Sequence, residues 1–101
     1  MPDLPVACTL SPTALKARRA NLLADLLRRA VDHHELTDGY RLRFAGEGNV
    51  LSAIARTVDA ERQCCRFLRF TVTVEPGDGP IALDLTGPAG TREFLAAMLD
   101  L

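Results

Sequence analysis

Apolar residues recur at helical spacing in three segments of the chain. The first predicted helix runs from residue 12 to about residue 35, with Ser11 as N-cap and Pro12 in its first turn. The second runs from Asn49 to Cys64 or Cys65, and its apolar stripe is Val50, Leu51, Ile54 and Val58. A third helix is expected from about residue 89, and its apolar side carries Phe94, Leu95, Met98 and Leu99.

Alternation of apolar and polar residues predicts strands between these helices. It is found over residues 40–44, 68–74 and 81–85. Residues 76–80, Pro-Gly-Asp-Gly-Pro, are typical of a turn, so the last two strands should form a hairpin. Residues 6–10 are also β-prone, and Pro5 before them indicates a strand at the edge of the sheet.

The resulting order of elements is β-α-β-α-β-β-α. It predicts a single α+β domain over residues 1–101, a two-layer sandwich in which helices cover one face of a mixed four-stranded sheet. From residue 40 onward the order follows most of a ferredoxin-like unit, without its last strand. A chain of this length buries roughly 60–70% of its unfolded surface, which is enough for one core.

Charge and cysteine usage narrow the classes of function. The chain has 12 basic and 13 acidic side chains and a net charge of −1, without the basic excess of a nucleic-acid-binding protein. No apolar run reaches the ~18–20 residues of a membrane span, and residues 1–5 do not look like a secretory signal. We therefore expect a cytoplasmic protein with neither nucleic acid nor membrane as partner. Its three cysteines should be reduced thiols there, not a disulfide framework.

An acid and a thiol fall within the apolar stripe of the second predicted helix. Glu61 and Cys65 lie within about 20° of the centre of that stripe, and Cys64 lies on its shoulder. A carboxylate buried without a partner costs several kcal/mol. A structural explanation is that Glu61 accepts hydrogen bonds from a buried arginine or from amides, while the cysteines serve as small apolar side chains.

A second explanation is a site for a soft ion. Thiolates select Zn(II), Cu(I) and thiophilic species such as Hg(II) or As(III), and a nearby carboxylate can act as ligand or proton acceptor. Adjacent cysteines cannot easily both chelate one ion, so a third thiol is needed. Cys8 shares a strand face with Val6 and Leu10, so Cys8, Glu61 and Cys64 or Cys65 can converge if that strand passes near the end of the second helix.

A third explanation is thiol redox or nucleophilic chemistry. Cys64 and Cys65 lie at the C-terminal end of a helix, whose partial negative charge disfavours a thiolate. Cys8 precedes the N-terminus of the first helix, where a thiolate is favoured. An enzyme would use Cys65 as nucleophile and Glu61 as acid or base. The chain has no Ser/His/Asp order, zincin helix or nucleotide signature, which argues against an enzyme.

Three short motifs carry a resemblance to known sequences. Residues 61–70 follow the pattern E-x-x-C-C-x-F-x-x-F, residues 86–90 read T-G-P-x-G before a helix, and residues 7–10 read Ala-Cys-Thr-Leu. In these motifs, which span most of its length, the chain resembles a family of small uncharacterised bacterial proteins. The resemblance implies a family but no activity.

The sequence therefore favours a soft-metal or metalloid-binding or thiol-sensing domain, whose site residues are Cys8, Cys64, Cys65 and Glu61. The alternative is a non-catalytic interaction module that homodimerises through its sheet and holds its cysteines as structural residues. His33 and His34 are expected near the end of the first helix, where the helix dipole favours histidine, and not as metal ligands.

Overall fold

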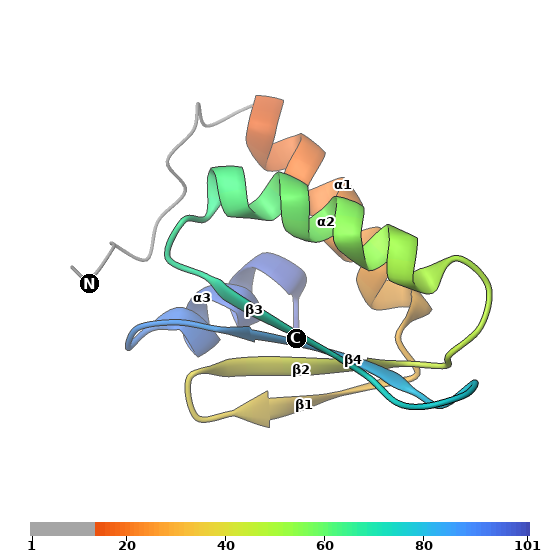
Figure 1. Cartoon of the computed structure of the whole chain (residues 1–101). Coiled ribbons are helices and arrows are strands. Elements are labelled where there is room, and N and C mark those ends of the chain that lie inside the picture. Colours follow the sequence, from red (N-terminus) through yellow and green to blue (C-terminus); the bar gives the residue numbers. More distant parts are fainter. Residues whose placement is uncertain (1–13) are drawn as a thin grey trace.

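The computed structural model describes the backbone of residues 14–101 and the side chains of residues 22–63 and 65–101. Its elements are α1 (Ala14–Arg29), β1 (Asp32–Leu36), β2 (Gly39–Phe44), α2 (Val50–Cys64), β3 (Arg69–Val74), β4 (Ile81–Thr86) and α3 (Thr91–Leu99). The four strands form one sheet in the order β1-β2-β4-β3. Helices α1 and α2 lie over one face of the sheet (Figure 1), and α3 packs against both β2 and α1. The predicted α+β fold with helices on one face is confirmed.

Every pairing among the four described strands is antiparallel, which corrects the prediction of a mixed sheet for this part of the chain. β1 and β2 form one hairpin and β3 and β4 form another, and hairpin strands are antiparallel. β2 and β3 run parallel to each other on either side of α2 in the sequence, but β4 lies between them. The arrangement is a split β-α-β unit, in agreement with the predicted partly ferredoxin-like order.

The first helix ends earlier than its predicted limit at residue 35. It ends at Arg29, and residues 32–36 form β1, which pairs with β2 through a two-residue turn. His33 and His34 therefore lie on an edge strand, which corrects their predicted position at a helix end. The strand predicted over residues 6–10 lies outside the described residues. Apart from β1, a strand that was not predicted, the order of elements from the first helix onward is the predicted one.

Strand register brings the apolar residues of the sheet onto the face that the helices cover. Tyr40, Leu85 and Phe70 form one row across β2, β4 and β3, and Leu42, Leu83 and Val72 form the next. Leucines of α1, Ile54 of α2 and Leu95 of α3 complete the core from the helix layer. Burial of these side chains is the main stabilising contribution to the fold.

The opposite face of the sheet carries no helix among the described elements, and its polar side chains pair with one another. Arg41 donates two hydrogen bonds to the Asp84 carboxylate, at 2.8 and 3.0 Å. Arg43 donates to Asp32 at 3.3 Å. Gly39 lies at the edge of this face, where β2 approaches β4 closely. A Cβ at Gly39 would lie 1.8 Å from the Leu85 carbonyl oxygen, so only glycine fits there.

Candidate functional site: a buried acid and thiol at the end of α2

Helix α2 presents one continuous buried stripe to the core. The stripe recurs every three or four residues and consists of Val50, Ile54, Thr57, Glu61 and Cys65, the residue that follows the helix. Helical spacing predicted that Glu61 and Cys65 face inward, and both are 0% exposed. Leu51, which the same spacing placed on the apolar stripe, is instead 45% exposed, so the buried stripe is narrower on that side than predicted.

Two buried polar residues lie on this stripe, Thr57 and Glu61. The Thr57 hydroxyl donates to the Ala53 carbonyl oxygen at 2.8 Å, one turn earlier, so its burial is satisfied within the helix. Glu61 is among the largest fully buried side chains of the described residues. A buried carboxylate is costly unless it is compensated, and such groups are rare in small cores.

Cys65 is the first residue after α2, where the chain turns toward β3. Its N–H donates to the Glu61 carbonyl oxygen at 2.6 Å, and its own carbonyl oxygen accepts from Leu68 at 3.1 Å. This short turn fixes Cys65 one helical turn beyond Glu61 and holds both on the core side. Side chains spaced by four residues on a helix are neighbours, about 5–6 Å apart at their Cβ atoms.

Phe67 connects this turn to the start of α3. Its ring meets that of Phe94 edge to face, with centroids 5.3 Å apart. A Cβ at Gly87 would lie 3.1 Å from the Phe67 carbonyl oxygen and 2.6 Å from the Thr91 hydroxyl, so the turn before α3 packs directly on this segment. The two motifs at residues 61–70 and 86–90 are therefore neighbours in space.

Sequence reasoning missed buried Thr91, since nothing in its spacing distinguishes it from an exposed helix-start residue.

Two of the predicted site residues cannot be located by their side chains. Cys64 is the last residue of α2, and Cys8 lies outside the described residues. Among the side chains that the structure does describe, no three histidine, cysteine, aspartate or glutamate residues lie close enough to hold a metal ion. His34 lies 3.5 Å from Asp32 on the exposed edge strand, far in the sheet order from β3.

The electrostatic setting of Cys65 favours a cation more than a bare thiolate. The C-terminal end of α2 carries the negative end of the helix dipole, and the Glu61 carboxyl group lies one turn away. Both features oppose a negative charge on sulfur. These two features therefore disfavour activation of Cys65 as a nucleophile.

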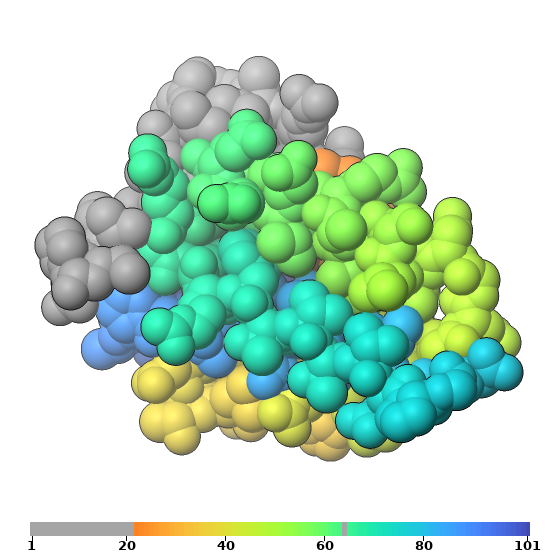
Figure 2. Space-filling view, in the orientation of Figure 1, coloured from red at the N-terminus to blue at the C-terminus, as the bar shows by residue number. Residues whose placement is uncertain are grey.

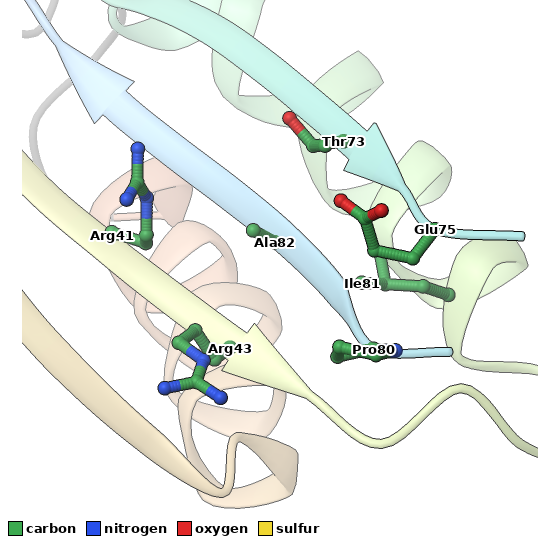
Figure 3. Close-up of a pocket in the computed structure, with 7 residues that line it drawn as sticks. All are labelled: Arg41, Arg43, Thr73, Glu75, Pro80, Ile81 and Ala82. Atoms are coloured by element: carbon green, nitrogen blue, oxygen red, sulfur yellow. The ribbon is translucent and has the colours of Figure 1, made fainter.

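A second feature, a hollow of about 260 Å³, lies on the helix-free face of the sheet. Figure 3 shows that Arg41 and Arg43 enter it from β2 and that Glu75, at the end of β3, lies across β4 from them. The pKa of Arg41 is raised above its ordinary value by its hydrogen bond to Asp84 and by the charge of that carboxylate. Because both arginines are already paired, the hollow offers no strong anion site.

Comparisons with known proteins do not identify a family for this chain. No family model, curated protein or solved structure matches the chain. Among the described residues, no helix is long and apolar enough to cross a membrane. Fold and site together define a small α+β domain with a buried acid and thiol at the end of one helix.

Proposed function

We propose that this chain is a cytoplasmic domain that binds a soft metal or metalloid ion through thiolates. Cys65, Cys64 and Cys8 supply the sulfur donors, and Glu61 supplies the carboxylate that tunes the charge of the site. The observation that carries the proposal is the complete burial of Glu61 and Cys65, one helical turn apart, at the end of α2.

The type of donor supports a soft ion. Sulfur ligands select Zn(II), Cu(I), Hg(II) or As(III) over Mg(II) and Ca(II), which prefer sites made only of oxygen. One thiol with one carboxylate is an incomplete set, so the proposal requires at least one of the other two cysteines. Cys64 is adjacent in sequence to Cys65, and Cys8 is the third thiol of the chain.

Thiol sensing without an ion has less support. A sensor cysteine is an accessible thiol with a stabilised thiolate. Cys65 is 0% exposed and lies where the helix dipole opposes the thiolate. An ion that binds sulfur directly offsets the unfavourable effect of the helix dipole, because its positive charge lies next to the thiolate.

The experiment is equilibrium dialysis of the reduced, full chain against each ion in turn, Zn(II), Cu(I), Hg(II) and arsenite, followed by elemental analysis. We expect one equivalent of at least one of these ions to be retained. Cys65→Ser and Cys65→Ala should both lose it, because the two replacements differ in polarity but share the absence of sulfur. Thermal unfolding by circular dichroism checks that each variant is folded.

A variant in which all three cysteines are serine is the matched negative control. The proposal is contradicted if the wild-type chain retains no more of any ion than this control does. Equal retention by wild type and Cys65→Ala also contradicts it. In either case Cys65 is a structural residue of the core.

The second candidate function is a non-catalytic module that homodimerises through its sheet. A specific observation favours it, because Val72 and Val74 on β3 are 41% and 53% exposed. Large apolar side chains left on a strand at the edge of a sheet are typical of a contact surface.

A further inference from the structure

Strand β3 is an edge of the sheet with an apolar side and no neighbouring strand among the described residues. The sheet order places it outside β4. Its residues lie on the surface that faces the viewer, below α2 (Figure 2). Val72 and Val74 point to the same side of the sheet as the core residues Leu83 and Ile81 with which they are paired. They nevertheless remain 41% and 53% exposed.

The hydrogen-bonding groups of β3 that face away from β4 can be assigned from the ladder. The Glu75 N–H donates to the Pro80 carbonyl oxygen at 3.2 Å, so residue 75 points its amide toward β4. In an antiparallel ladder this direction alternates along the strand. The backbone groups of Phe70, Val72 and Val74 therefore point outward, away from the sheet.

We propose that two copies of this chain pair through β3, antiparallel, about a two-fold axis at Val72. In this register Phe70 lies opposite Val74 of the second copy, and Val72 lies opposite Val72 of the second copy. The three residues whose backbone groups point away from the sheet are therefore paired with one another. Arg69 then lies opposite Glu75 at both ends of the contact. Directly opposite residues share a face of the sheet, so the helices of both copies lie on the same side of one sheet that contains the four described strands of each copy.

Charge complementarity selects this register. Arg69 and Glu75 both lie on the helix-free face, which follows from the alternation of β3. A shift by two residues in either direction separates them and loses both ion pairs. A shift by one residue places Val72 opposite a threonine and turns the helices of the second copy to the other side of the sheet.

The remaining surfaces of the sheet are less suited to this contact. The other edge, β1, reads Asp-His-His-Glu-Leu and has no exposed apolar side chain in its central three residues. Polar and charged residues on an edge strand discourage pairing. On the helix-free face the arginines of β2 are already bonded to Asp84 and Asp32. This proposal rests on the second candidate function, homodimerisation through the sheet, and specifies the edge strand and the register of the contact. It does not depend on the ion site.

The experiment measures the oligomeric state of the full chain by sedimentation equilibrium over a range of concentrations. The wild-type chain should dimerise. Arg69→Glu and Glu75→Arg should each raise the dimer Kd about tenfold, since each converts two symmetry-related attractive pairs into two repulsive ones. The double variant, Arg69→Glu with Glu75→Arg, restores the opposite charges and should return the Kd to near the wild-type value.

Glu35→Arg is the matched control, because it reverses an exposed carboxylate on β1, the opposite edge of the sheet. It should leave the Kd unchanged. A monomer at every concentration overturns the proposal. A dimer in which the two single reversals have no effect, or in which the double reversal gives no rescue, overturns the β3 register. Loss of ion binding in the cysteine variants has no bearing on any of these outcomes.

Discussion

Replacing Glu61 with glutamine tests the role of the buried acid in ion binding. The substitution keeps the size and shape of the side chain and replaces a group that can carry a negative charge with one that cannot. If Glu61 tunes the charge of a thiolate site, Glu61→Gln should still bind the ion through sulfur, but more weakly. The Cys65 variants, in contrast, should lose the ion altogether.

The size of the effect follows from the geometry of α2. Side chains four residues apart on a helix are separated by about 5–6 Å at Cβ, and Glu61 and Cys65 are both 0% exposed. A unit charge at about 6 Å from another, at an effective dielectric constant of about 20, contributes about 3 kcal/mol. That energy corresponds to roughly a hundredfold change in Kd. Removal of groups that support metal ligands usually costs about 10–100-fold in affinity.

The assay is competition for the retained ion with a chelator of known affinity, carried out on wild type, Glu61→Gln and Asp59→Asn. Asp59 is an exposed carboxylate on the same helix, so its substitution removes the same charge where solvent screens it. We expect less than a threefold change for this control, a change that corresponds to about 0.6 kcal/mol. Equal affinity for wild type and Glu61→Gln would refute the reasoning and leave Glu61 as a purely structural acid.

Four further predictions concern the fold and the pH dependence of the site. Gly39→Ala should lower the free energy of unfolding by about 1–3 kcal/mol in a urea titration, because the added Cβ collides with the Leu85 carbonyl oxygen. Leu83→Ala should cost about 2–5 kcal/mol in the same titration, since this side chain is fully buried in the sheet. Arg41→Ala should have a smaller effect in the same titration than either of these two substitutions, because its ion pair with Asp84 is partly exposed. Ion affinity should rise with pH below about 8.5, the ordinary pKa of a thiol, because each bound thiolate must first lose its proton.

The local periodicity of α2 predicted the placement of the buried pair. The stripe from Val50 through Ile54 fixes which side of the helix meets the sheet, and a residue at a multiple of the helical repeat must share it. Periodicity correctly predicted that Glu61 lies on the core-facing side of α2, where its side chain is buried. It misplaced Leu51, because the width of the buried stripe depends on where α1 and the sheet end, which no local pattern records.

Strand β1 shows where local pattern fails. Residues 32–36, Asp-His-His-Glu-Leu, have neither alternation nor β-branched side chains, so nothing in their sequence indicates a strand. They become one because β2 offers unpaired backbone groups beside them, with Leu36 and Gly39 closing a tight turn. Backbone pairing to a neighbouring strand outweighed a weak helical continuation past Arg29.

Contacts between distant segments were equally beyond local pattern. The edge-to-face contact of Phe67 with Phe94 joins the end of α2 to α3 across more than twenty residues of sequence. Neither residue has a spacing that indicates the other. Such contacts arise from tertiary packing, which decides where the two sequence motifs meet.

The most direct measurement of the central claim is X-ray absorption spectroscopy of the chain loaded with one equivalent of the ion that it retains in dialysis. The account predicts sulfur neighbours at about 2.3 Å from the metal, reduced in number in Cys65→Ala. A shell of only oxygen and nitrogen at about 2.0–2.2 Å, unchanged in Cys65→Ala, would contradict it.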